Sequence, residues 1–270
     1  MLRAGLFAVL LAVVALGAAG IGSHVGNGGA AARPAGESMT MGSATEGLAA
    51  GAEGYTFVPE RTSFSRGAST FRFRILDKTG APAHAFDLEG GVRLHLIVAR
   101  RDLAAGDYQH VHPVLQPDGS WSAPLRFGAA GAYRAFADFD AGGKKIVLGT
   151  DLFVPGWSAA PQPLRAATTS TAGPYRVRLA DDALRAGDES SLRFTVDGAD
   201  SFQTYVGARG HLVALHAGDL AYTHIHPTGG SGGDIVFDAD FQHAGAYRLF
   251  LQFKRDGHVY TAPFVLRVAR

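Results

Sequence analysis

The sequence contains no cysteine, and that absence excludes several kinds of site. Disulfide bridges, thiolate-bound metals, cysteine nucleophiles, a lipid anchor on cysteine and a type 1 copper site all require the missing residue. The 270 residues carry a formal net charge of only +1, which argues against a dedicated nucleic-acid-binding protein. With 47% hydrophobic and 18% charged residues, the chain can nevertheless bury a core.

Long helical periodicity is absent after residue 22, and short runs with a period of two take its place. Apolar and polar residues alternate over residues 70–75, 92–98 and 132–139, with turn residues such as 77–80 between them. Strand-like runs at intervals of about ten residues are typical of a sandwich or barrel. The sequence therefore predicts an all-β protein made of immunoglobulin-like β-sandwiches.

The N-terminal region is predicted to be a targeting segment and a tether rather than part of the folded domains. Residues 1–22 combine Arg3 with an uncharged apolar run, as in a signal peptide, and the run is also close to the minimum for a membrane anchor. Both outcomes remain open, and both predict an extracytoplasmic protein, either secreted or anchored. Residues 23–54 are rich in Gly, Ala and Ser and predict a disordered tether. Within it, Met39 and Met41 could bind Cu(I), although incidental methionines in a solvated tether are the simpler interpretation.

An internal repeat divides the rest of the chain. Residues 108–139 align with 222–253 at an offset of 114 without a gap, and 13 of 32 positions are identical. We therefore predict two copies of one domain, residues 55–155 and 175–270, joined by a Pro-rich linker over 156–174. In each copy Ala-Gly-Ala-Tyr-Arg resembles the tyrosine corner of immunoglobulin-like sandwiches.

Three histidines occupy matching places in each copy. One lies in an apolar run, and two follow as His-x-His before a proline, in a pattern that recurs after 114–116 residues. On a strand, residues two apart point to one face, and the first histidine belongs to the preceding strand of the same hairpin. The predicted metal ligands are His95, His110, His112, His211, His224 and His226.

Three neutral imidazoles suit a zinc or copper ion. Ligation needs the neutral ring, so the affinity is expected to fall as the pH drops through about 6.5. A purely structural role, in which the imidazoles brace the sandwich, remains the alternative. His216, close to the second set in sequence, is a further candidate ligand.

The two-copy arrangement resembles exported actinobacterial proteins with paired YtkA-like or FixH-like immunoglobulin-fold modules. The resemblance rests on the apolar start, the tether, and Tyr-x-His-x-His-Pro followed by Ala-Gly-x-Tyr-Arg, and it covers residues 55 to 270. It implies extracytoplasmic handling of heavy metals such as copper, with another exported metal-handling protein as a possible partner. The β domains contain no methionine, unlike copper carriers.

No known catalytic motif is present: the chain has no Gly-x-Ser-x-Gly, no His-Glu-x-x-His and no phosphate loop. Carboxylates such as Asp87, Glu89 and Asp118 lie in turn-like stretches and are expected to be solvated. We therefore expect a non-enzymatic metal-binding protein with copper or zinc as its ion, no nucleic-acid partner, and membrane contact only through the N-terminal segment. A cell-surface adhesion or scaffold module is the alternative function.

Overall fold

Alternating side chains produce strands with one buried and one exposed face. In the computed structural model, which describes residues 46–180 and 184–270, β3 (Gly67–Leu76) buries Phe71, Phe73 and Ile75 completely. Arg72 and Arg74 lie between them on the more exposed face. This is the pattern of a sheet that covers a core on one side.

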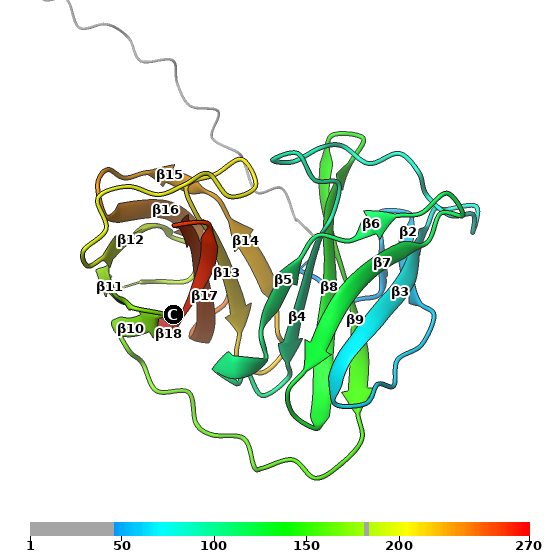
Figure 1. The fold of residues 1–270 in the computed structure, drawn as a ribbon, viewed down its shortest axis with the longest axis horizontal. Coiled ribbons are helices and arrows are strands. Elements are labelled where there is room, and N and C mark those ends of the chain that lie inside the picture. Colours follow the sequence, from blue (N-terminus) through cyan, green and yellow to red (C-terminus); the bar gives the residue numbers. More distant parts are fainter. Residues whose placement is uncertain (1–45, 181–183) are drawn as a thin grey trace, which may run out of the picture. The chain divides into compact units, whose positions relative to one another are not determined.

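The first repeat has two antiparallel sheets that face each other (Figure 1). The first sheet has the order β1 (Gly51–Ala52), β2 (Tyr55–Pro59), β3, β7 (Trp121–Phe127) and β6 (Val114–Leu115). The second has the order β5 (Gln109–Val111), β4 (His95–Arg100), β8 (Gly131–Ala141) and β9 (Lys144–Val154). A single 3-10 turn, η1 (Ala105–Asp107), lies between β4 and β5.

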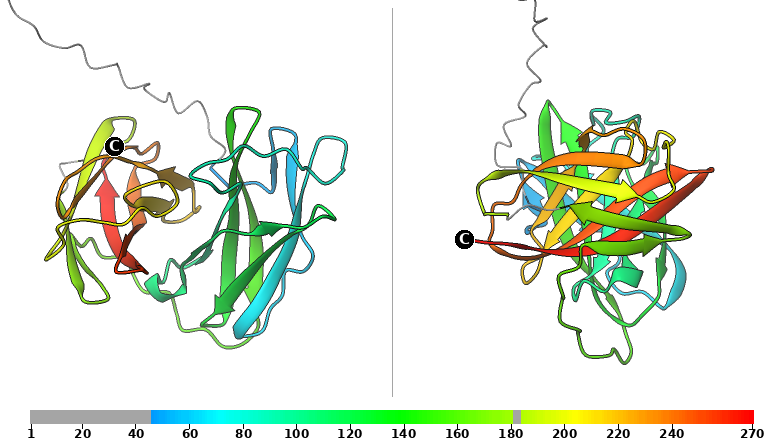
Figure 2. Two further views of the ribbon diagram at one scale, coloured as in Figure 1. Left: turned by 45° about the horizontal axis from the view of Figure 1, so that its top comes forward. Right: turned by 90° about the vertical axis from the view of Figure 1, so that its left-hand side faces the viewer.

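The second repeat has the same strand order. One sheet runs β10 (Thr169–Ala172), β11 (Tyr175–Ala180), β12 (Glu189–Val196), β16 (Asp234–Asp240) and β15 (Pro227–Gly229). The other runs β14 (Tyr222–Ile225), β13 (His211–His216), β17 (Gly245–Arg255) and β18 (His258–Val268). The layers of each repeat can be followed from two further directions in Figure 2. The predicted all-β fold class and the internal repeat are both confirmed.

Each repeat encloses its own hydrophobic core, and each has its own tyrosine corner. In the first core Trp121 packs between Phe73 and Phe86, and in the second Phe194 contacts Phe237 and Phe264. The predicted tyrosine corners are present in both repeats. The hydroxyl of Tyr133 donates to the carbonyl of Ala129 at 2.8 Å, and that of Tyr247 donates to the carbonyl of His243 at 2.9 Å.

A third hydrophobic cluster joins the outer faces of the two histidine-bearing sheets. The Tyr108 ring stacks on Phe250 with centroids 3.9 Å apart, and Phe136 stacks on Tyr222 at 5.0 Å. Strands β4 and β13 are therefore covered on both faces, and residues 46–270 belong to one compact unit. The buried members of this cluster are Ile97, Ala99, Leu103, Phe136, Val147, Val213, Leu215, Leu220, Tyr222 and Phe250.

Two predicted boundaries differ from the structure. The tether was expected to reach residue 54, but Gly51–Ala52 form β1. The backbone oxygen of Gly47 accepts hydrogen bonds from the guanidinium of Arg134, and a Cβ at Gly47 would come 2.5 Å from the Phe136 ring. The linker, expected over 156–174, gives way to β10 at Thr169. These short segments are held mainly by backbone hydrogen bonds and close approach, which leave no periodic pattern of side chains.

The predicted export segment, residues 1–22, lies outside the described residues, as do residues 23–45 of the predicted tether with Met39 and Met41. Within residues 46–180 and 184–270, no helix is long and apolar enough to cross a bilayer.

Candidate metal centre

Strand register brings the first three histidines to one face. In the β4–β5 pair, Leu96 lies opposite Val111 and Ile97 lies opposite His110. Residues in register share a face, so His110 lies on the same side as Ile97 and His95, and His112 follows two residues later. Val111, between the two histidines, packs against the core of the first repeat.

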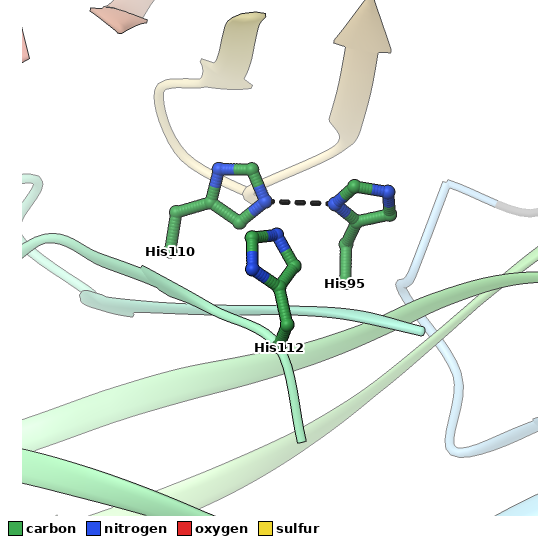
Figure 3. A group of neighbouring side chains, drawn as sticks. All are labelled: His95, His110 and His112. Carbon is green, nitrogen blue, oxygen red and sulfur yellow. Dashed lines mark hydrogen bonds between the residues drawn. The ribbon is translucent and has the colours of Figure 1, made fainter. Parts of the chain in front are cut away.

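The first triad, His95, His110 and His112, is compact (Figure 3). Its ring centroids are 4.9 to 5.1 Å apart, and one nitrogen from each ring lies within 4.8 Å of the others. Nδ1 of His95 is 2.8 Å from Nε2 of His110, the contact drawn as a dashed line in Figure 3. His95 is 1% exposed and His110 is 8% exposed, so both rings are removed from bulk water.

The second triad, His211, His224 and His226, has the same construction. Leu212 lies opposite Ile225 and Val213 opposite His224 in the β13–β14 pair. The ring centroids are 4.7 to 5.3 Å apart, and Nδ1 of His211 is 3.1 Å from Nε2 of His224. The sequence predicts three ligand-competent imidazoles in each copy, and the structure brings those residues together in both.

The two triads also meet each other, which sequence analysis did not predict. The ring of His95 is 5.0 Å from that of His224 and 5.9 Å from that of His211, and the ring of His110 is 5.8 Å from that of His224. These separations between repeats are close to those within a triad. The signal in the sequence was the apolar character of both faces of residues 94–98 and 212–215, which requires a second packing partner.

Each repeat supplies hydrogen-bond partners for the histidines of the other. Nδ1 of His110 donates to Oε1 of Gln252 at 2.6 Å, and Nδ1 of His224 donates to Oδ2 of Asp138 at 2.9 Å. Asp138 and Gln252 are equivalent positions of the repeat, because each lies directly opposite the first histidine of its own triad on the neighbouring strand. Each residue accepts a hydrogen bond from a histidine of the other repeat and so orients its imidazole.

Glu89 reaches histidines of both triads. Its Oε2 is 3.7 Å from Nε2 of His95, and its Oε1 is 3.5 Å from Nδ1 of His226. Lys145 Nζ lies 2.5 Å from Oε2 of Glu89 and 3.1 Å from Oδ1 of Asp138. The expectation that Glu89 is a solvated turn carboxylate is wrong, since its side chain is 26% exposed and engaged with three charged or titratable groups.

The hydrogen bonds determine where the ring protons must be. In the second triad, Nδ1 of His224 donates to Asp138 and Nε2 of His211 donates to the carbonyl of Tyr205 at 2.8 Å. In neutral rings each remaining nitrogen then carries a lone pair. Those two lone pairs, on Nδ1 of His211 and Nε2 of His224, face each other at 3.1 Å. Two lone pairs at this distance repel each other, and a metal ion held by both nitrogens would relieve the repulsion.

In the first triad, too, the hydrogen bonds leave one buried ring nitrogen without a proton. Because Nδ1 of His110 donates to Gln252, its Nε2 must accept from Nδ1 of His95. Nε2 of His95 is then unprotonated, buried and without a hydrogen-bond partner, and it faces the Glu89 carboxylate. Were Nδ1 of His95 and Nε2 of His110 to hold a metal ion, the His95 proton would lie on Nε2, which faces the Glu89 carboxylate at 3.7 Å. The residues present therefore fit a metal ion.

Burial keeps most of these imidazoles neutral. Loss of hydration is the main reason that the pKa values of His95, His110 and His112 lie below the usual range, and neighbouring histidines add to it. Burial likewise lowers the pKa of His211 to about 3 and that of His226 to about 4. The expectation that ligation weakens near pH 6.5 applies to free imidazole, and in the folded protein these rings are ready to bind metal at lower pH.

Asp138 remains a carboxylate although it is completely buried. Burial opposes its charge, but Lys145 and the hydrogen bond from His224 hold the pKa of Asp138 below its usual value. Tyr222 also donates its hydroxyl to Oδ2 of Asp138 at 2.8 Å. Asp138 is therefore a fixed negative charge beside the second triad.

The remaining histidines that the structure describes lie elsewhere. His216 was considered as an extra ligand, but its Nδ1 pairs with Oδ1 of Asp219 at 2.7 Å and its ring contacts His243. His211 is the first residue of strand β13 and His216 is the last, so the length of the strand separates His216 from the triad. The extra-ligand role of His216 is therefore not supported.

Comparison with known proteins identifies one family. The sequence profile of the "Domain of unknown function (DUF8832)" matches the chain twice, over residues 50–155 and 168–270. No curated protein matches the sequence. The likeness to YtkA-like and FixH-like modules, and the copper association that it implies, stay predictions.

Solved structures resemble the chain only remotely. Salmonella alpha-2-macroglobulin reacted with methylamine is 13% identical with a TM-score of 0.30, and the match covers 82% of this chain and 15% of that one. Yersinia pseudotuberculosis InvD is 14% identical with a TM-score of 0.27, covering 80% and 57%. The fibronectin(III)-like modules of Clostridium thermocellum CbhA are 11% identical with a TM-score of 0.23, covering 79% and 93%. The chain thus spans well under two thirds of the first two proteins, and we base no functional conclusion on any of them.

Proposed function

The chain belongs to the family described as Domain of unknown function (DUF8832), and from the site itself we propose that it is an extracytoplasmic, non-enzymatic protein that binds copper or zinc. The ligands are His95, His110 and His112 in the first repeat and His211, His224 and His226 in the second. The observation that carries the proposal is the pair of lone-pair-bearing nitrogens, Nδ1 of His211 and Nε2 of His224, that face each other at 3.1 Å while their outer nitrogens are hydrogen-bonded.

The donor set narrows the choice of ion. Imidazole nitrogens alone suit Zn(II), which accepts three histidines and leaves a fourth position open, and Cu(II), which binds imidazole more tightly than other first-row divalent ions. Hydrogen bonds from outer ring nitrogens to a carboxylate, an amide and a carbonyl are the usual support of metal-bound histidines. A cleft of about 510 Å³, lined by Glu89, Gly90 and His226 among others, offers an entry path.

A binding role is favoured over catalysis by the occupation of the nearby carboxylates. Asp138 accepts from His224 and Tyr222 and pairs with Lys145, and Glu89 pairs with the same lysine. Both carboxylates are thus held by partners within the protein. The expected signal or anchor segment, residues 1–22, and the resemblance to heavy-metal-associated modules favour a buffer or carrier outside the cytoplasm.

Elemental analysis of protein expressed without residues 1–22 tests the proposal. We expect up to two equivalents of copper or zinc at pH 7.5 and a rise in melting temperature with added metal, because binding at one hundred times the dissociation constant stabilises the folded state by about 2.7 kcal/mol. Changing His110 and His112 together to Ala should remove one equivalent. Protein that takes up neither metal would show that the histidines are structural, and would favour the adhesion or scaffold function.

A further inference from the structure

The surroundings of the two triads differ at equivalent positions of the repeat. Asp138 in the first repeat corresponds to Gln252 in the second. Glu89 corresponds to Tyr205, since each begins the same tight turn: the Glu89 amide donates to the carbonyl of Val92 at 2.9 Å, and the Tyr205 amide donates to that of Ala208 at 2.8 Å. The first repeat thus carries two carboxylates at positions where the second repeat carries an amide and a phenol.

Both carboxylates support the second triad. Asp138 Oδ2 accepts from His224 at 2.9 Å, and Oε1 of Glu89 lies 3.5 Å from Nδ1 of His226. The other oxygen of Glu89, at 3.7 Å from His95, is the one that Lys145 approaches to 2.5 Å. The same lysine lies 3.1 Å from Oδ1 of Asp138, so in both carboxylates it pairs with the oxygen that does not face the second triad.

Neutral groups contact His110 and His112 of the first triad. His110 donates to the amide oxygen of Gln252 at 2.6 Å, and Tyr205 lies 6.1 Å from the His110 ring and 6.0 Å from the His112 ring, measured between centroids. An imidazole that donates to a neutral acceptor is less basic than one that donates to a carboxylate. A neutral acceptor also leaves the charge of a bound divalent ion uncompensated.

The cleft beside the site gives a second, independent asymmetry. Its lining includes His226 of the second triad together with Glu89, Gly90 and residues 206–209, whereas no residue of the first triad contributes to it. An ion that enters from this side meets His226 and the Glu89 carboxylate first.

We propose that the two triads are unequal metal positions: His211, His224 and His226 take a divalent ion first and hold it tightly, and His95, His110 and His112 hold a second ion more weakly and exchange it. The inference rests on the proposed function. The proximity of the triads strengthens the inequality, because the first bound cation repels the second across rings whose centroids are only 5.0 to 5.9 Å apart.

A Zn(II) titration of the full chain against a chromophoric chelator at pH 7.5 tests this. The unsubstituted protein should bind one zinc tightly and a second at least tenfold more weakly. His226→Ala should abolish the tight step, and its equivalent in the first repeat, His112→Ala, should abolish the weak one. The two variants replace equivalent histidines of the two repeats, and circular dichroism verifies that each variant is folded.

Glu89→Gln gives a second test at a partly exposed position. It should weaken the tight step by about 10- to 100-fold, the usual effect of removing a group that supports a metal ligand, with a much smaller change in the weak step. Two steps of equal affinity, loss of the tight step in His112→Ala, or binding of only one zinc by the unsubstituted protein, abolished by either histidine variant, would overturn the inference. A complete absence of zinc binding would instead overturn the proposed function.

Discussion

Two tyrosines with buried hydroxyls occupy equivalent positions of the repeat but make different contacts. Tyr108 and Tyr222 each begin the His-x-His segment of their repeat, and both lie in the cluster between the repeats. The Tyr222 hydroxyl donates to Asp138 at 2.8 Å, whereas the Tyr108 hydroxyl is buried without a hydrogen-bond partner. The identical sequence context gives no sign of this difference, because it depends on a carboxylate from the other repeat.

Replacing these tyrosines by phenylalanine should therefore have unequal effects. Tyr222→Phe removes a hydrogen bond to a buried carboxylate and should lower the free energy of unfolding by about 1.5–3 kcal/mol. Tyr108→Phe removes an unpaired buried hydroxyl and should be neutral or slightly stabilising. Urea denaturation of both variants measures the comparison, and equal losses would contradict the assigned hydrogen bond.

The histidines should make the metal-free protein sensitive to acid. Burial lowers the pKa of His211 to about 3 and that of His226 to about 4, whereas an unfolded chain protonates histidine near pH 6.5. Between these values the unfolded state binds more protons than the folded state, so stability falls as the pH decreases. The loss approaches about 1.4 kcal/mol per pH unit for the buried His211 and is smaller for His226, which is partly exposed.

Urea midpoints measured from pH 7.5 to pH 4.5 without metal test this dependence. The midpoint should be nearly constant above about pH 7 and should decline below about pH 6. Saturating zinc should raise the midpoint at pH 7.5, and this gain should persist well below pH 6, because protons compete with metal for His211 and His226 only near their folded-state pKa values of about 3 and 4. A midpoint that is flat down to pH 4.5 would show that the rings do not stay neutral in the folded state.

At the scale of the strand, β4 and β13 could be predicted only in part. The period of two and the apolar runs predicted central strands, and the register placed Val111 and Ile225 in the cores, with the histidines on the other face. The partner of that other face could not be predicted, because it comes from a strand pair in the other repeat. The support from Asp138, Gln252 and Glu89 was missed for the same reason: such contacts leave no local spacing.

The outer faces of these sheets should contribute to stability as strongly as a core does. Phe250 is fully buried on the face that meets the other repeat and stacks on Tyr108. Phe250→Ala should cost about 3–5 kcal/mol, as expected for a large side chain removed from a packed interior. Phe153, on β9 and 52% exposed, is the matched control and should change the urea midpoint little when replaced by Ala.

At the scale of the whole molecule, each repeat forms its own core, but the face between the repeats is built from residues of both. Each core comes from one repeat, so each repeat has what it needs to form a sandwich. The third cluster and the supporting hydrogen bonds at the site both require the other repeat. Tandem domains joined by a Pro-rich segment, the organisation that the sequence predicts, would not require such a joint core.

Separate expression of residues 46–155 and 156–270 measures this dependence. Each piece should show β-type circular dichroism, and each should expose an apolar face that drives association when the two are mixed. The mixture should form a one-to-one complex in sedimentation analysis and should bind metal more tightly than either piece alone. Two pieces that stay monomeric in the mixture would show that the third cluster contributes little.

The reciprocal support of the triads has a consequence for how such a centre could arise. A single-copy protein could build it only as a homodimer, with both triads related by a twofold axis. In that arrangement every substitution appears twice, and the two metal positions must stay identical. Joining the copies in one chain removes this constraint, so that Asp138 and Gln252, or Glu89 and Tyr205, could diverge independently. The pseudo-symmetry retained in the strands and lost around the imidazoles is what such a history would leave behind.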